Sequence, residues 1–131
     1  MWHRVDGMRS MELGTPGKMR AELNGFVLAG SKRATAGLLE DYHQEGEELE
    51  QVGERLALVD DDGAMLGVIE VTAVDVVPFL EVPWEFADAE GEGLTSIDDW
   101  REAHLRFWEA EGFSVTDDTP VVCVRFDLVE T

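Results

Sequence analysis

The chain has 131 residues, 44% of them hydrophobic, and a formal net charge of −19 at pH 7. This length suits one domain with a single core, and no apolar run approaches the roughly 20 residues that a membrane-spanning helix needs. Cys123 is the only cysteine, which excludes an internal disulfide and a cysteine metal cluster. The first residues, "MWHRVDGMRSMELG", lack the apolar stretch of a signal peptide, so we expect a cytoplasmic protein.

The first half of the chain is predicted to hold one long helix and one strand. Thr15 and Pro16 are a typical N-cap and first helical residue. Apolar residues then recur at the helical spacing i, i+4, i+7, i+8, and Gly30 supplies a stop. A β-leaning stretch at 34–39 follows, and the acidic stretch 40–54 is predicted to be a loop.

The second half is predicted to hold three strands and two helices. In order, they are strands at 55–60 and 64–77, helices at 84–90 and 97–111, and a strand at 121–129. Asp60–Gly63 has the composition of a hairpin turn, and Gly67 predicts a bend or bulge. Ser96 and Asp99 resemble a helix-capping pair. The sum is an α+β fold, with a small antiparallel barrel-like sheet and flanking helices.

The segment "GSKRAT" places Lys32 and Thr35 where the first helix ends and a strand begins. A lysine there commonly complements the helix dipole, and a threonine commonly suits the strand. The functional alternative is that Lys32 lies within reach of the Thr35 hydroxyl. A partly desolvated lysine loses its proton more readily and can act as a base toward that hydroxyl.

A second candidate segment is the glycine-broken stretch "ADAEGEGLTS", which holds Glu90. Its glycines would allow the backbone to turn sharply near a ligand, although most acidic residues are simply exposed. Trp100, His104 and Trp108 follow at helical spacing, a pattern typical of core packing with the histidine at its rim. The three histidines of the chain show no ligand spacing with one another, so we expect no metal site.

The stretch "LAGSKRATAGLL" resembles the ASCH-domain family, whose fold is similar to the PUA-like RNA-binding barrel. The marker of that family is Gly-x-Lys-x-x-Thr after the first core helix, matched here by Gly30, Lys32 and Thr35. The segments "GTPGKMRAELN", "VGERLALVDDDG", "VIEVTAVDVVPF" and "AEGEGLTSIDDWREAH" look like an acidic bacterial branch. The likeness covers about residues 12–129.

This resemblance implies a single ASCH domain over residues 1–131, with 1–14 as an N-terminal extension. It also implies a cleft between barrel and helices that suits a nucleotide base or a short RNA segment. Some members remove the acetyl group from N4-acetylcytidine through a lysine, a threonine and a glutamate. These catalytic residues map to Lys32, Thr35 and Glu90, with Glu92 as the alternative glutamate. The N-terminal extension and the longer, aromatic second helix depart from the small amidohydrolases of the family.

The resemblance also suggests which residues would bind the substrate. Backbone amides near Gly30 and Ser31 would help to stabilise an oxyanion, with Arg33 beside them. Trp84 or Trp100 would stack on a pyrimidine, an interaction worth roughly 1–3 kcal/mol per base. Core filling is the alternative role for both tryptophans.

The charge distribution ranks the possible activities. Residues 1–33 hold six of the ten Lys and Arg but only three of the 29 Asp and Glu. The acidic remainder repels a polyanion but not a neutral nucleoside. We therefore expect an amidohydrolase of N4-acylated cytidine-type nucleosides without a cofactor, acting away from membranes and long duplex nucleic acid. The alternatives are a non-catalytic nucleoside sensor, or a module for short single-stranded RNA that is either binding or Mn²⁺-dependent ribonuclease. The basic patch of the RNA module would comprise Lys18, Arg20, Lys32 and Arg33.

Overall fold

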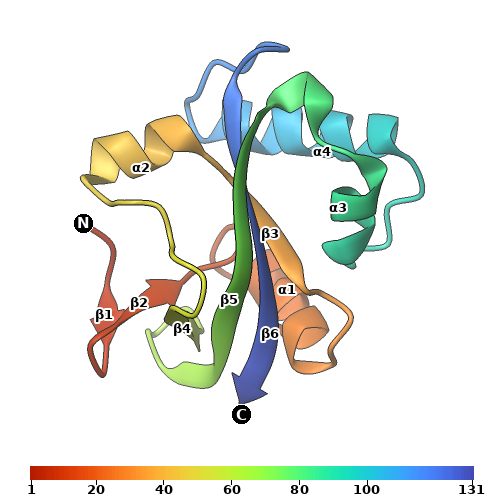
Figure 1. Ribbon diagram of the computed structural model, residues 1–131. Helices are drawn as coiled ribbons and strands as arrows, with labels where there is room; N and C mark the ends of the chain where they lie inside the picture. Colours follow the sequence, from red (N-terminus) through yellow and green to blue (C-terminus); the bar gives the residue numbers. More distant parts are fainter.

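The structure is a computed structural model that describes residues 1–131. It contains six strands and four α-helices (Figure 1). In chain order they are β1 (Arg4–Val5), β2 (Met8–Met11), α1 (Lys18–Leu28), β3 (Ala34–Leu38), α2 (Leu39–Glu45), β4 (Arg55–Val59), β5 (Met65–Pro78), α3 (Trp84–Ala89), α4 (Ile97–Ala110) and β6 (Pro120–Glu130). A short 3-10 helix at Phe79–Glu81 follows β5. None of the helices combines the length and the apolar character needed to cross a membrane.

All six strands form one sheet in the order β1-β2-β4-β5-β6-β3. β2 and β4 are parallel, and every other neighbouring pair is antiparallel. The register of β5 with β6 shifts between Val68 and Ile69 and again between Val71 and Ala73. Such irregularities bend a strand, so the predicted bend is confirmed. The α+β fold class is confirmed as well, although the sheet keeps two free ends and is not a closed barrel.

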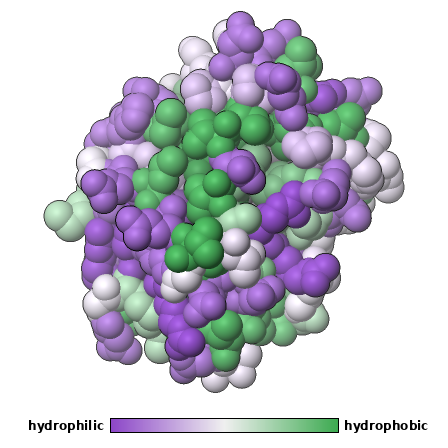
Figure 2. Space-filling model, in the orientation of Figure 1, coloured by the Kyte–Doolittle hydropathy of each residue, from purple (hydrophilic) through white to green (hydrophobic).

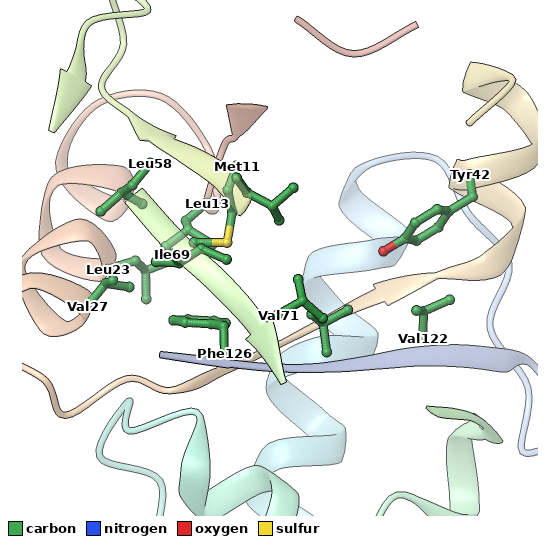
Figure 3. Packing of buried hydrophobic residues seen from close by; sticks show 12 residues of the cluster. Met11, Leu13, Leu23, Val27, Tyr42, Leu58, Ile69, Val71, Val122 and Phe126 are labelled. Carbon is green, nitrogen blue, oxygen red and sulfur yellow. The ribbon is translucent and has the colours of Figure 1, made fainter. Parts of the chain in front are cut away.

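Strand β6 contributes to two hydrophobic clusters, because alternate residues of a strand point to opposite faces. Val122, Val124 and Phe126 belong to the larger cluster, which includes side chains of α1 and α2 (Figure 3). Val121 and Cys123 belong to the second cluster, which includes side chains of α3 and α4. The sheet is therefore packed on both sides near β6.

The start of α1 differs from its prediction. The helix begins at Lys18 with Gly17 as N-cap, so Thr15 and Pro16 are not the cap and the first helical residue. The carboxylate of Asp61, in the β4–β5 turn, accepts a hydrogen bond from the Gly17 N–H at 2.9 Å. A tertiary contact thus replaces the local cap that the sequence predicted.

The acidic stretch 40–54 is not wholly a loop, because α2 occupies its first part. Tyr42 anchors this helix in the larger cluster and donates its hydroxyl hydrogen to Glu50 at 2.8 Å. One buried aromatic among charged residues gives no helical periodicity, which explains why the pattern failed here. Gly46, with φ of 66°, ends the helix in the left-handed conformation.

Residues 1–14, which the sequence analysis set apart as an extension, supply β1 and β2. Met11 and Leu13 are buried in the larger cluster. Arg9 contacts both carboxylate oxygens of Glu54 at 2.8 Å, a bidentate pair that fixes orientation as well as distance. The segment is therefore part of the sheet and of the core.

The face that carries β5 is shown in Figure 2. Apolar residues gather along its middle, and hydrophilic residues surround them (Figure 2). The hydrophilic surround agrees with the net charge of −19.

Candidate functional site

The segment "GSKRAT" begins with the turn that ends α1. Gly30 has φ of 84°, and its N–H donates to the Val27 carbonyl oxygen at 3.0 Å. The Ser31 N–H donates to the Phe26 carbonyl oxygen, also at 3.0 Å. This is the Schellman arrangement, in which a left-handed glycine ends a helix. The predicted helix stop is confirmed, and the reversal of the chain buries Lys32 just before β3 begins.

A second turn, which follows α3, packs directly against the first. The Arg33 N–H donates to the Ala89 carbonyl oxygen at 2.8 Å. At Gly91, where φ is 63°, an added Cβ would lie 1.9 Å from the Ser31 carbonyl oxygen. No side chain fits in that space, so glycine is required both for the close approach and for the positive φ. The contact brings the glutamates on either side of Gly91 to the lysine of the motif.

Lys32 is the first functional side chain that this contact positions. It is only 2% exposed. Its Nζ donates to the Ala34 carbonyl oxygen and to Oε2 of Glu92, both at 2.8 Å. An ammonium has three N–H donors, so one remains for a ligand. Burial of a charge requires such a partner, and Glu92 provides it.

Glu90 is the second buried charge, with 1% exposure. Its Oε2 accepts a hydrogen bond from Nε1 of Trp100 at 2.6 Å and lies 3.1 Å from Nε2 of His104. The other ring nitrogen of His104, Nδ1, lies 2.9 Å from the Trp100 carbonyl oxygen. A carbonyl oxygen only accepts, so Nδ1 carries a proton. Contact between Nε2 and the carboxylate then requires a second proton, which the pair shares.

The pKa values of this pair shift in the directions expected of an ion pair. Burial acts to raise the pKa of Glu90, but the hydrogen bond from His104, the charge of Lys32 and the hydrogen bond from Trp100 outweigh it and lower the pKa. Burial acts to lower the pKa of His104, but the hydrogen bond and the charge of Glu90 outweigh it and raise the pKa. The proton therefore resides mainly on His104.

Thr35 and the buried charges line one small cavity of about 110 Å³. Its walls include Lys32, Glu90, Glu92 and His104. Thr35 lies in β3, where it pairs with Val124 of β6. The structure thus brings together the three residues predicted to be catalytic, Lys32, Thr35 and Glu90, together with the alternative Glu92.

The residues predicted to bind substrate do not line this cavity. The amides of Gly30 and Ser31 donate to helix carbonyls, which removes them as oxyanion donors. Arg33 and Trp84 are exposed on the surface outside the cavity. Trp100 is fully buried behind His104 and stacks on its ring at 4.1 Å, so it orients Glu90 and has no free face for a base.

Four residues of α4 that were not predicted to belong to a site line the cavity: Ala103, His104, Phe107 and Trp108. Their spacing places them on one face of a helix, and two of them were part of the aromatic stripe that the sequence analysis interpreted as core. Only the nearness of α4 to Glu90 shows that this stripe also forms a wall of the site.

A metal ion does not fit the site as it stands. The ligand atoms of Glu90, Glu92 and His104 lie within 4.8 Å of one another, close enough for one ion. However, the Lys32 ammonium already forms an ion pair with the Glu92 carboxylate, and His104 holds the proton that it shares with Glu90. A metal-binding imidazole must be deprotonated. The Mn²⁺ that the ribonuclease alternative needs would have to displace both positive groups.

The basic patch that the RNA alternative requires is not assembled. Lys32 and Arg20 are buried, and Arg20 donates to the carbonyl oxygens of Leu13 and Gly14 at 3.0 and 3.2 Å. Only Lys18 and Arg33 of the proposed set are exposed.

An α+β fold that places a buried lysine, a buried glutamate and a half-buried threonine around one cavity has the features expected of an ASCH domain. The ASCH-domain family model matches residues 9–130. The chain therefore belongs to the ASCH-domain family, which confirms the resemblance noted in the sequence.

Solved structures agree with this assignment. An ASCH domain from Lactobacillus crispatus is 30% identical, with a TM-score of 0.82, over 95% of this chain and 82% of its own. A protein from Enterococcus faecalis is 31% identical, also with a TM-score of 0.82, over 91% of this chain and 74% of its own. An ASCH protein from Zymomonas mobilis shares the fold alone, at 10% identity and a TM-score of 0.54 over 82% of this chain and 63% of its own. No curated protein matched the chain.

Replacing His104 with glutamine should remove a pH-dependent part of the stability. The raised pKa of His104 makes its contribution complete below its ordinary value of 6.5, and the contribution is lost as pH rises through the raised value. The lowered pKa of Glu90 makes its contribution complete above 4.5, and this is lost as pH falls through the lowered value. The difference in free energy of unfolding between the wild type and His104→Gln should therefore be largest between pH 4.5 and pH 6.5. Urea unfolding across pH measures the margin, and a margin that stays constant from acid to alkaline pH would contradict the shared proton.

Proposed function

We propose that this ASCH-domain protein is an amidohydrolase that removes the acyl group from the N4-amine of a cytidine-type nucleoside. The supporting observation is the cavity that Thr35 shares with two ion pairs, Lys32–Glu92 and His104–Glu90, each with one fully buried partner. Such a site offers a nucleophile, a hydrogen-bond donor for an oxyanion and groups that accept and return a proton.

In this mechanism the Thr35 hydroxyl attacks the acyl carbon. Its proton passes to Glu92, whose side chain is 21% exposed and lines the cavity. The C–N bond breaks, and the leaving amine receives a proton from the Glu90–His104 pair. Water then hydrolyses the acyl-threonine ester. Its hydroxyl group joins the acyl carbon and leaves in the carboxylic acid, its other proton restores the Glu90–His104 pair, and the proton held by Glu92 restores the Thr35 hydroxyl.

Lys32 fits the role of oxyanion donor better than that of base. Its ammonium donates hydrogen bonds to Glu92 and to the Ala34 carbonyl oxygen, both at 2.8 Å. The third N–H is available for the carbonyl oxygen of the substrate. A charged donor in a buried site stabilises developing negative charge more strongly than it would in water.

The test is hydrolysis of N4-acetylcytidine, followed by chromatography of cytidine. The wild type should release cytidine, and neither EDTA nor added salt should change the rate appreciably, because the reaction needs no metal and the substrate is neutral. Lys32→Met and Glu90→Gln should both lose activity, whereas Glu109→Gln, an exposed position of α4, should retain it. Absence of turnover in the wild type would reject the proposal. RNA cleavage with Mn²⁺ and nucleoside binding would then be the next assays.

A further inference from the structure

A second, larger chamber of about 490 Å³ continues from the small cavity. Six residues line both spaces: Leu13, Gly14, Thr35, Ala36, Phe107 and Trp108. Figure 3 shows Tyr42 of α2 across from Met11 and Leu13, with its hydroxyl directed toward them, and all three line the chamber. A volume of this size is within the usual range for small-molecule sites. A substrate whose acyl group lies at Thr35 could therefore place the rest of its atoms in this chamber.

The chamber wall is rich in carboxylates. The acidic residues that line it are Glu12, Asp41, Glu45, Glu50 and Glu111. The cations that line it are Arg9 and Arg20, and both are committed elsewhere. Arg9 is paired with Glu54. Arg20 donates to backbone carbonyls and lies 3.7 Å from Asp61. Neither Glu54 nor Asp61 lines the chamber. Among the acids, Glu45 pairs with the N-terminal ammonium at 2.6 Å and Glu50 accepts the Tyr42 hydroxyl hydrogen at 2.8 Å. Glu12, Asp41 and Glu111 remain as acceptors for hydroxyl groups, and the lining offers an anion no uncommitted cation.

The carboxylates of the two flanking helices also interact electrostatically. Burial raises the pKa of Asp41, and the charges of Glu45 and Glu111 raise it further. Asp41 and Glu45 belong to α2, whereas Glu111 is the C-cap of α4. Negatively charged side chains of α2 and of the end of α4 therefore line the chamber, and both would repel an anion that binds between them.

We infer that the chamber holds the sugar of the substrate and selects an unphosphorylated nucleoside over its 5′-phosphate. This inference rests on the proposed function and specifies its substrate class. Ribose hydroxyls donate hydrogen bonds that carboxylates accept. A phosphate brings two negative charges and only acceptor oxygens, so like-charge repulsion and unpaired acceptors both oppose its entry.

The experiment compares kcat/KM for N4-acetylcytidine with kcat/KM for its 5′-monophosphate. The wild type should favour the nucleoside at least about tenfold, because the phosphate is repelled by the carboxylates of the chamber. The double variant Asp41→Asn, Glu111→Gln should move the ratio toward one. The matched control, Glu40→Gln with Glu109→Gln, removes the same charge from exposed positions of α2 and α4 outside the chamber. It should leave the ratio unchanged.

The outcomes separate this inference from the proposed function. Turnover of both substrates at similar efficiency would overturn the inference and leave the amidohydrolase standing. If the wild type hydrolyses neither substrate, calorimetric titration with cytidine and with cytidine 5′-monophosphate still tests the chamber. Cytidine should then bind at least about tenfold more tightly. Equal binding of the two, or no binding of cytidine, would overturn the inference.

Discussion

Replacing Thr35 with valine should lower kcat/KM for the acylated nucleoside at least about a thousandfold, because valine keeps the shape of threonine but removes the nucleophile. Valine is also β-branched and suits a strand, so β3 should keep its pairing with β6. Steady-state hydrolysis with purified variants measures the loss, and circular dichroism checks the fold.

Two companion variants sharpen this result. Thr35→Ser keeps a hydroxyl and should retain part of the activity. Thr72→Val makes the same chemical change at an exposed position of β5 and should be fully active. Activity of Thr35→Val within about tenfold of the wild type would show that the hydroxyl is not the nucleophile. Direct attack by water, with Glu92 as base, would then be the mechanism to test.

Replacing Gly91 with alanine should lower the free energy of unfolding by about 3 kcal/mol or more. The left-handed conformation costs roughly 1–2 kcal/mol for a residue with a Cβ, and the new methyl would lie 1.9 Å from the Ser31 carbonyl oxygen. Backbone atoms cannot rotate away as a side chain can, so the two turns must separate. Activity should fall with stability, because this contact aligns Glu90 and Glu92 with Lys32.

Gly93→Ala is the matched control for this change. Gly93 also has a positive φ, of 83°, but an added Cβ there meets no atom within 4 Å. Gly93→Ala should lower the free energy of unfolding only by the roughly 1–2 kcal/mol that the left-handed conformation costs. Glu90, Glu92 and Lys32 should stay aligned. Equal losses of stability for the two variants, measured by urea unfolding, would show that the contact between the turns contributes nothing.

The sequence predicted most of the fold because most elements carry local signals. Apolar runs predicted β4, β5 and β6, with alternation in β6, and Ser96 caps α4 as expected, with its hydroxyl oxygen accepting the Asp99 N–H at 3.1 Å. The failures occur where tertiary contacts replace local signals. Asp61 caps α1 from a distant turn, and a single buried tyrosine holds α2 against the sheet.

The candidate site could be predicted only in part. The family motif identified Lys32 and Thr35, and the glycine-broken stretch identified Glu90 and Glu92, which the structure places in one cavity. The role of His104 depends on a proton shared with a residue 14 positions away, and no spacing rule reveals such a partner. The substrate-binding residues were expected near the motif and at two tryptophans, whereas the remaining walls of the cavity come largely from α1 and α4.

The order of the sheet has a consequence for how this protein is made. The strand that carries Thr35 pairs only with β6, which lies more than 80 residues later in the chain. A ribosome releases β3 long before its partner, so the nascent chain holds Thr35 on an unpaired strand until β6 emerges. Folding that depends on such distant pairing is slow compared with folding through local contacts. The cavity that Thr35 shares with Lys32 and Glu90 therefore cannot form before β6 is made, and a chain truncated before β6 should lack it.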